Sequence, residues 1–539
     1  MEKVLNLGTY TKSMGSEDVV FPERRSRVFA RNMVATSQPL AAQSGVDALR
    51  RGGNAVDAAI AMAITLTVVE PNNNGVGSDA FAQVWDGATL HGVNGSGRSP
   101  AAWSPDRFSD RDRMPTLGWD AVTVPGAVSV WRMLSERFGR LAFADLFRDA
   151  IHYARSGFQV GPISAYFWDL TVRHMDRFPD FLAHFAPHGR APRPGELFRR
   201  PELADSLELI ADSGGEAFYS GALATAIAEH ARAAGAALTF EDLASHRADW
   251  VTPIAQSYHG VSLHEIPPNG QGLAAQIALA LLEPFDLGSQ PLGSAESIHL
   301  QIEAMKIAIT AAFDHFADPR AMVLPVTELL DPESLRLASA SISQKASTPA
   351  PVKLPVSLDT VCLAAADEEG MMVSFIQSNY LGFGSGVVIP GTGIAMQNRG
   401  RGFSLEEGHP NRVDGSKRPF HTIIPGFVTQ AGEALLSFGV MGGHMQHQGH
   451  VQMVHRMFDH DQDPQSASDA PRWQVFEDMS IGLEAGFPVS VAEDLAARGH
   501  SVRFVGEAHV FGGAQLIQRV EGGYCGGSDH RKEGQVAGF

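Results

Sequence analysis

The sequence predicts a mixed α/β protein with a large buried core, and three observations support this fold class. The chain has 539 residues, 44% of them hydrophobic and 19% charged, which are ordinary proportions for a globular protein. Between residues 33 and 69, apolar side chains recur every three or four positions, as they do in helices. Residues 360–378 contain two apolar runs on either side of the polar turn DEEG, which predicts a β-hairpin.

The N-terminal part of the chain predicts an arm, two helices and two strands. Residues 1–30 are polar and irregular, and we expect them to form the arm. Gly52 and Gly53 interrupt the helical pattern, so two helices are predicted, and Asn54 is placed to cap the second. The Gly-rich turn NNNGVGSDA follows, and AFAQVWDG and TLHGVNGSGR have the composition of strands.

The rest of the chain divides at a Pro-rich segment. Residues 124–340 are predicted to be mainly helical, with amphipathic segments such as PGAVSVWRMLSERFG and SIHLQIEAMKIAITAAFDHF. Residues 344–359 have no periodicity and few large apolar side chains, so we expect a flexible surface linker. This linker runs directly into the predicted hairpin, whose first strand begins at Thr360.

Charge and cysteine content exclude several classes of partner. The formal net charge is −18, which would repel nucleic acid and anionic membranes. Only two cysteines occur, Cys362 and Cys525, so no disulfide framework is predicted. The N-terminus lacks a secretory signal, and the apolar run at residues 58–69 is too short to span a bilayer. These absences lead us to expect a cytoplasmic protein.

Thr360 is the residue whose position suggests chemistry. A threonine at the start of a buried strand is often only a β-branched residue in a suitable place. Cleavage of the peptide bond before Thr360 would, however, free an α-amine beside its hydroxyl group. An amine with a pKa near 8 can act as a general base, and the adjacent linker could move aside to open a pocket.

Four blocks of sequence resemble the γ-glutamyltransferase family, in order and over most of the chain. The first runs from residue 33 to residue 87 and the second is TVCLAAADEEGMMVSFIQSNYLGFGSGVVIPGTGIAMQN. KRPFHTIIP and VMGGHMQHQGHVQ resemble the two blocks that follow. The resemblance is strongest to the branch without a signal peptide, which is similar to glutathione hydrolases.

The resemblance implies the four-layer αββα sandwich of N-terminal nucleophile hydrolases and self-cleavage between Asp359 and Thr360. The large part, residues 31–359, and the small part, residues 360–539, are then expected to stay associated as one interleaved unit. Further dimerisation is left open. No metal and no organic cofactor is implied, and the expected partner is a small-molecule amide or γ-glutamyl substrate.

Catalytic roles follow from the resemblance at four positions. Thr360 matches the family's nucleophile, and Ser378 falls where a second hydroxyl orients it. Gly442 and Gly443 match the paired glycines whose backbone N–H groups form the oxyanion hole. Consecutive glycines suit that role because no side chain obstructs the approach of the two amides to an oxyanion. A plain turn is the alternative interpretation.

The substrate-binding positions depart from the γ-glutamyl pattern. Tyr380 replaces an asparagine, and within QNRGRGF Asn398 stays a candidate contact. Arg399 and Gly402 stand where typical members have a glutamine and an aspartate. That aspartate would hold the ammonium group of a γ-glutamyl substrate, and Gly402 cannot. The pocket has gained Arg399, so we expect an acidic acyl group to be preferred over one bearing an ammonium.

Three further positions complete the predicted pocket. His421 and Thr422 occupy the place of two serines that contact a substrate carboxylate. Arg98 lies near the family's carboxylate-binding arginine and suits bidentate recognition, although a surface arginine is the alternative. The segment 403–419 is shorter than in members with a lid loop, which favours hydrolysis over transfer to an acceptor.

Other interpretations remain open at this stage. His444, His447 and His450 have helical spacing, but without an accompanying acidic base we do not predict a metal site. Cys362 shares a strand face with Thr360 and could line the pocket, or simply pack in the core. Two rival functions are an acylase or oxamate amidohydrolase of the same fold, and an uncleaved binding protein.

Overall fold

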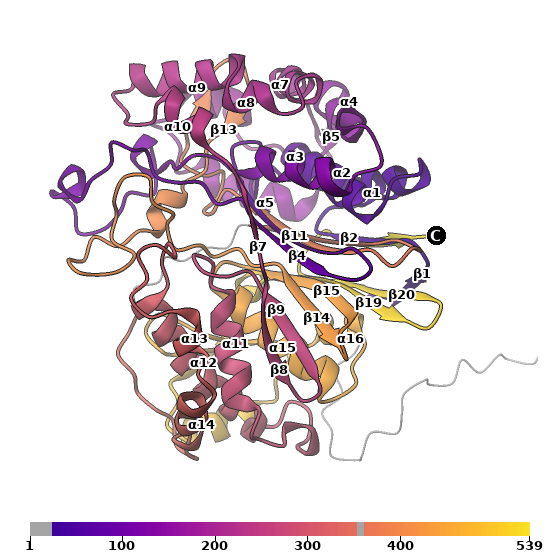
Figure 1. Ribbon diagram of the computed structural model, residues 1–539, viewed down its shortest axis with the longest axis vertical. Coiled ribbons are helices and arrows are strands. Elements are labelled where there is room, and N and C mark those ends of the chain that lie inside the picture. Colours follow the sequence, from indigo (N-terminus) through magenta and orange to yellow (C-terminus); the bar gives the residue numbers. More distant parts are fainter. Residues whose placement is uncertain (1–23, 353–359) are drawn as a thin grey trace, which may run out of the picture.

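The computed structural model describes residues 24–352 and 360–539 and consists of four layers. Two seven-stranded sheets lie face to face, and helices cover the outer face of each (Figure 1). We call them the upper sheet and the lower sheet, after their places in Figure 1. The layers are therefore helix, sheet, sheet and helix, which confirms the predicted αββα sandwich.

All neighbouring strands in the two sheets are antiparallel. The upper sheet contains, in spatial order, β21 (Gln535–Gly538), β2 (Met33–Thr36), β10 (Val361–Ala366), β11 (Met372–Ser378), β3 (Asp79–Trp85), β4 (Leu90–Asn94) and β7 (Asp249–Val251). The lower sheet contains β1 (Val28–Ala30), β20 (Gly523–Ser528), β19 (Gly513–Val520), β15 (Glu433–Met441), β14 (Gly426–Gln430), β9 (Val261–Glu265) and β8 (Ile254–Tyr258). Each sheet thus combines strands from before and after Thr360.

Smaller sheets lie outside the sandwich centre. They are β5 (Phe158–Gln159) with β6 (Leu197–Phe198), β12 (Val388–Ile389) with β13 (Ile394–Ala395), and β16 (Trp473–Val475) with β17 (Ile481–Glu484) and β18 (Val502–Val505).

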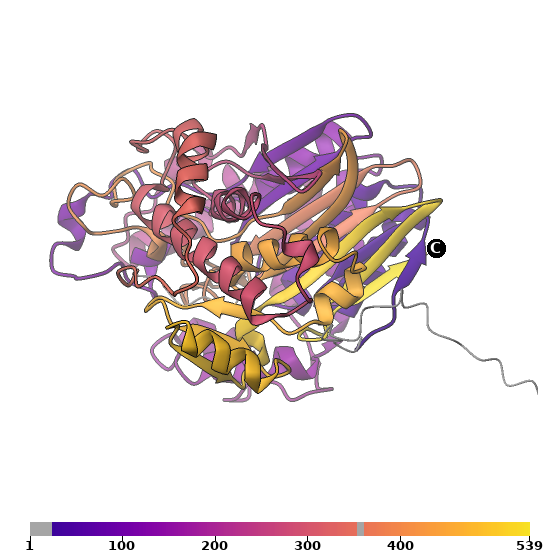
Figure 2. The ribbon, with the colours of Figure 1, turned by 90° about the horizontal axis from the view of Figure 1, so that it is seen from below.

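The helices divide between the two outer layers. The upper layer contains α1 (Pro39–Arg50), α2 (Ala55–Val69), α3 (Ala127–Phe138), α4 (Arg148–Ser156), α5 (Pro162–Val172), α6 (Pro179–Phe185), α7 (Pro201–Asp212), α8 (Glu216–Tyr219), α9 (Ala222–Ala233) and α10 (Phe240–Ser245). The lower layer contains α11 (Gly272–Leu282), α12 (Ala295–His315), α13 (Val326–Leu329), α14 (Pro332–Ala340), α15 (Met445–Phe458), α16 (Pro464–Asp469) and α17 (Val489–Ala497). Figure 2, seen from below, shows helices of this layer lying across the strands of the lower sheet.

The predicted helix break, helix cap and hairpin are all confirmed by the structure. Asn54 caps α2 in a capping box with Asp57, and α1 ends before the Gly52–Gly53 break. The predicted hairpin is β10 and β11, with Val361 opposite Gln377. The largely helical prediction for residues 124–340 missed β7, β8 and β9. β7 pairs with β4 and β9 pairs with β14, both distant in sequence, and β8 pairs with β9 at the edge of the lower sheet.

The N-terminal arm differs from its predicted extent. It was expected to cover residues 1–30, but Val28–Ala30 form β1, which pairs with β20 at the edge of the lower sheet. Residues 1–23 of the arm lie outside the described residues. So do residues 353–359 of the predicted linker, and with them Asp359 of the expected cleavage site.

An apolar cluster lies between the two main sheets. Cys362 of β10 packs in a cluster with Ile376 of β11 and Met441 of β15, so the two sheets meet directly there. Among the helices that the structure describes, none combines the length and the apolar character needed to cross a membrane.

Candidate active site

Thr360 lies immediately before β10 and is completely buried. Its Oγ1 donates a hydrogen bond to Ser378 Oγ at 3.4 Å. Ser378 ends β11, and the antiparallel register brings it beside Thr360. Ser378 Oγ also accepts the Tyr380 backbone N–H at 2.8 Å. The Ser378 hydroxyl therefore accepts hydrogen bonds both from the backbone of Tyr380 and from the hydroxyl of Thr360.

Gly442 and Gly443 form the turn between β15 and α15. Their φ angles are +113° and +58°, a region that favours glycine. A Cβ atom on Gly442 would lie 2.9 Å from the Cα atom of Gly512. The Gly442 carbonyl accepts the Met445 N–H, whereas within the described part of the chain neither glycine N–H donates to a protein group. Two adjacent backbone donors are thus left available at the beginning of a helix.

The glycine turn and Thr360 lie at the same end of the stacked sheets. A Cβ atom on Gly439 of β15 would lie 2.4 Å from Cys362 Sγ, so these two backbones approach closely. Thr360 is two residues before Cys362, and the turn begins three residues after Gly439. Burial raises the pKa of the Cys362 thiol. Cys362 therefore packs in the core between the two sheets, which is the second of the two alternatives considered for this residue.

Arg399 forms the most polar wall of the site. It lies on the short 3₁₀ turn Arg399–Gly402 and is completely buried. Its guanidinium carbon lies 4.2 Å from the centre of the Tyr380 ring, and Nη1 donates to Thr422 Oγ1 at 2.8 Å. Among the described residues, Nε and Nη2 have no hydrogen-bond partner. These two N–H groups lie on one edge of the guanidinium, the edge that binds carboxylates in a bidentate manner.

A buried carboxylate, Asp79, balances the charge of Arg399. Asp79 Oδ2 lies 3.0 Å from His421 Nε2, and its Oδ1 accepts the N–H groups of Gly97 and Gly126. Burial raises the pKa of Asp79 to about 7, against the opposing effect of Arg399. Burial and nearby arginines hold the pKa of His421 well below its usual value. His421 is therefore neutral and donates its Nε2 proton to Asp79.

Asn398 is occupied by backbone groups. Its Nδ2 donates to the carbonyls of Thr116 and Gly384, both at 3.0 Å, and its Oδ1 accepts the Leu381 N–H. These contacts make Asn398 a support for the loops around Arg399.

Gly402 lies on the same 3₁₀ turn as Arg399, whereas Arg98 belongs to a separate charged cluster. Arg98 forms an ion pair with Asp318 at 3.3 Å, in a cluster that includes Arg320 and Arg418. No described contact links Arg98 to Thr360 or Arg399. A Cβ atom on Gly402 would lie 2.6 Å from the Phe420 carbonyl oxygen, so the backbone leaves no room there for an acidic side chain.

Two histidine clusters bear on the question of metal binding. His444 and His447 both direct Nδ1 at the Oε1 atom of Gln271, at 3.2 and 3.0 Å, whereas His450 pairs with Glu265. These three rings do not converge on one point.

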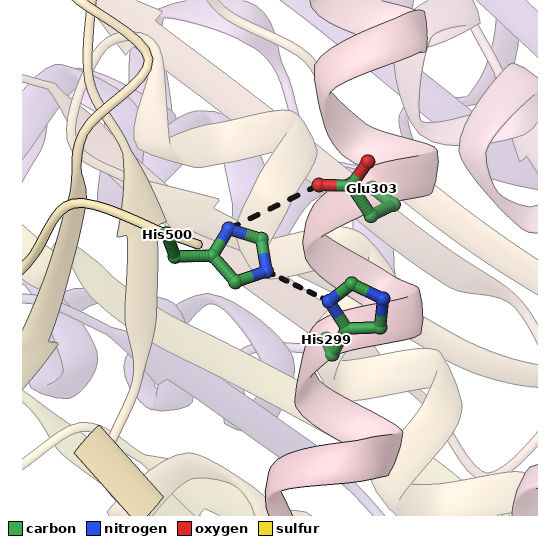
Figure 3. A group of neighbouring side chains, drawn as sticks. All are labelled: His299, Glu303 and His500. Carbon is green, nitrogen blue, oxygen red and sulfur yellow. Dashed lines mark hydrogen bonds and ion pairs between the residues drawn. The ribbon is translucent and has the colours of Figure 1, made fainter. Parts of the chain in front are cut away.

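The second cluster, His299, Glu303 and His500, lies between α12 and the loop after α17 (Figure 3). His299 Nδ1 and His500 Nε2 are 2.7 Å apart. The Lys306 ammonium is 2.9 Å from Glu303 Oε1 and 3.3 Å from His500 Nδ1. Glu303 and His500 are therefore already in contact with an internal cation, the Lys306 ammonium.

Comparisons with known proteins identify the family. A family model described as gamma-glutamyltranspeptidase matches residues 41–539. The chain belongs to the γ-glutamyltranspeptidase family. It is 36% identical over 527 residues to the glutathione hydrolase-like YwrD proenzyme of Bacillus subtilis, covering 96% of this chain and 100% of the relative. It is 33% identical over 530 residues to the oxamate amidohydrolase proenzyme of Klebsiella pneumoniae, covering 95% and 99%.

A solved structure agrees with this assignment. The crystal structure of a cephalosporin acylase from Bacillus halodurans superposes with a TM-score of 0.92 and 45% sequence identity, covering 98% of this chain and 99% of that one. The resemblance to the γ-glutamyltranspeptidase family and its N-terminal nucleophile fold are thereby confirmed.

Sequence reasoning missed two polar residues at the centre of this γ-glutamyltranspeptidase-family site. Asp79 begins β3, and a charged residue at the start of a completely buried strand was a signal that could have found it. Gln271 precedes α11 and contacts both Thr422 and the glycine turn. Nothing in its local sequence distinguishes it, because all its side-chain partners lie more than 100 positions away.

Proposed function

We propose that this chain is a self-processing amide hydrolase with Thr360 as its nucleophile. The observation that carries the proposal is the position of Thr360, buried at the start of β10 with its hydroxyl against Ser378. Cleavage of the bond between Asp359 and Thr360 would place a free α-amine on the residue that bears this hydroxyl. The names of the relatives as proenzymes support processing of this kind.

The proposed reaction uses the groups already described. The α-amine of Thr360 takes the proton from Oγ1, which attacks the amide carbonyl of the substrate. The N–H groups of Gly442 and Gly443 stabilise the tetrahedral oxyanion. The amine product leaves with a proton from the Thr360 amine, and a water molecule then hydrolyses the acyl-enzyme ester. Ser378 orients the attacking hydroxyl.

The acyl group that fits this pocket carries a carboxylate. Arg399 offers two buried N–H groups without a hydrogen-bond partner among the described residues, and removing such groups from water without a partner is unfavourable. A bidentate carboxylate would satisfy both. Gly402 has no side chain, so it offers no acidic group that could bind the ammonium group of a substrate. Tyr380, Thr422 and His421 would shape the rest of the pocket, and the short segment 403–419 favours water over an amine acceptor.

A panel of p-nitroanilides tests this specificity. We expect kcat/KM to be highest for glutaryl-p-nitroanilide, lower for γ-glutamyl-p-nitroanilide, and lowest for butyryl-p-nitroanilide, which lacks the distal carboxylate. A strong γ-glutamyl preference with rapid transfer to dipeptides would contradict the proposal. It would instead favour a transpeptidase with a different ammonium-binding group.

The names of two relatives suggest a second candidate function, which uses the same chemistry on a different acyl group. Similarity to a cephalosporin acylase and to an oxamate amidohydrolase favours a non-glutamyl acyl group. Adding oxamate and a glutaryl-bearing cephalosporin to the panel distinguishes these substrates, because oxamate places the carboxylate directly beside the scissile amide.

A further inference from the structure

Gln271 connects the two halves of the site through its side-chain amide. The residue immediately precedes α11 and is completely buried. Its Nε2 donates to the carbonyl oxygen of Thr422 at 2.5 Å and to that of Gly443 at 2.8 Å. One NH₂ group therefore bridges the loop that contacts Arg399 and the glycine turn that carries the proposed oxyanion donors.

The other end of the same amide is also fully used. Oε1 accepts from Nδ1 of His444 at 3.2 Å and from Nδ1 of His447 at 3.0 Å. Burial lowers the pKa of His444 to about 3 and holds that of His447 well below its usual value, so both rings are neutral. An amide can make four hydrogen bonds, and Gln271 makes all four. Its backbone N–H in addition donates to the His421 carbonyl at 3.0 Å.

We propose that Gln271 is a positioning residue that fixes the oxyanion turn relative to the acyl-binding loop. Gly442 and Gly443 have no side chains and positive φ angles, so the turn needs external contacts to hold one conformation. Gln271 supplies one of them at the Gly443 carbonyl. The inference rests on the proposed function, because it assigns the oxyanion role to these glycines. Gln271 itself need not touch the substrate.

The chain contains a matched control residue in α11, the helix that Gln271 precedes. Gln276 of α11 is also completely buried, and its Nε2 donates to two backbone carbonyls, those of Ile254 at 2.5 Å and Leu263 at 3.1 Å. These carbonyls belong to β8 and β9. Replacing Gln276 removes the same number of donor contacts without reaching the glycine turn.

The test compares Gln271→Met with Gln276→Met in the full-length protein. Both variants should lower the melting temperature, since both lose buried hydrogen bonds. With glutaryl-p-nitroanilide, and per mature active site, Gln271→Met should lose about 100-fold in kcat because an oxyanion donor is misplaced. Gln276→Met should stay within about twofold of wild type. The rate of self-cleavage should follow the same order.

Equal kcat values in the two methionine variants would overturn the inference and leave the proposed function intact. Failure of wild type to cleave itself would instead contradict the proposed function. Gln271→Glu serves as the second variant in case Gln271→Met does not fold. It keeps the length and the acceptor for both histidines but lacks the NH₂ donors, so we expect it to remain defective in kcat. If Gln271→Glu had the kcat of wild type, the two donor contacts would not be needed and the inference would be overturned.

Discussion

At the scale of single residues, Arg399 is distinguished by burial without full hydrogen bonding. Burial lowers its pKa to about 10, so it remains charged at neutral pH. One of its nitrogens is committed to Thr422, and two others have no partner among the described residues. Buried polar groups in native proteins are nearly always paired. The unpaired edge of Arg399 therefore indicates a ligand with a complementary carboxylate.

Replacing Arg399 should weaken the binding of an acidic acyl group. A charge-assisted hydrogen bond contributes about 1.5–3 kcal/mol, so Arg399→Gln should lower kcat/KM for glutaryl-p-nitroanilide about 10- to 100-fold, mainly through KM. Butyryl-p-nitroanilide should be hydrolysed with little change. Arg401→Gln, which removes the same charge from a half-buried neighbour, is the control. Equal losses of kcat/KM in both variants would indicate an effect of the net positive charge near the site rather than a specific contact with Arg399.

Asp79 should make substrate binding depend on pH. Burial raises its pKa from the usual 3.8 to about 7, so below that pH it is neutral and leaves the charge of Arg399 uncompensated. We therefore expect KM for glutaryl-p-nitroanilide to rise as pH increases through about 7. Asp79→Asn should abolish this dependence and keep KM low across the range. A pH-independent KM in wild type, measured between pH 6 and 8.5, would contradict this account.

The contacts of the candidate site residues were predictable only where a family pattern or the local chain revealed them. Thr360 and Ser378 lie in contact as expected, because a tight hairpin brings the ends of its strands together. Arg98 pairs with Asp318, and Asn398 binds backbone groups, because their partners come from loops distant in sequence. Gln271 was missed for the same reason.

At the scale of elements, the turn between β15 and α15 is the most constrained segment of the site. Gly442 has a positive φ angle and also faces the backbone of Gly512. Gly432, in the turn between β14 and β15, has a φ angle of +85°, and a Cβ atom added there would meet no heavy atom within 4 Å. The two glycines share their conformational requirement and differ in their surroundings.

Gly442→Ala should therefore abolish catalysis, whereas Gly432→Ala should cost only stability. A left-handed backbone conformation costs an L residue about 1–2 kcal/mol. Only Gly442→Ala would also bring a Cβ atom to 2.9 Å from the Cα atom of Gly512 and displace the proposed oxyanion donor. We expect at least a 100-fold loss in kcat and in the self-cleavage rate for Gly442→Ala. Urea unfolding checks the shared loss of stability. Normal turnover in Gly442→Ala would exclude this turn from the oxyanion site.

Elements defined by nearby residues were predicted well, and elements defined by distant pairing were not. The α1–α2 break and the cap at Asn54 depend on residues within one turn of helix. The strands β8 and β9 lie within a region dominated by helices, and β9 pairs with β14, more than 160 positions away. A single sequence contains little information about such pairing.

At the scale of the whole molecule, the two parts of the chain are interleaved. β10 and β11 of the small part lie between β2 and β3 of the large part. In the lower sheet, β14 of the small part pairs with β9 of the large part. Separating the parts would break pairing in both sheets and expose the apolar layer between them.

The mature fragments should consequently behave as one particle. After self-cleavage, we expect residues 1–359 and 360–539 to elute together in gel filtration, including in 1 M salt, and to separate only in denaturant. The physical reason is that strand pairing in both sheets and an apolar cluster between them connect the parts, and salt does not screen these contacts. Elution of free fragments in buffer would contradict this arrangement.

The central claim is that Thr360 becomes the N-terminal nucleophile, and intact mass spectrometry tests it most directly. Purified wild type should appear as two fragments, residues 1–359 and 360–539, while Thr360→Ala should remain one chain of 539 residues. Wild type that stays a single chain after prolonged incubation would contradict the claim and favour a binding protein. Cleavage of Thr360→Ala at the same bond would contradict it equally, because another group would then be the nucleophile.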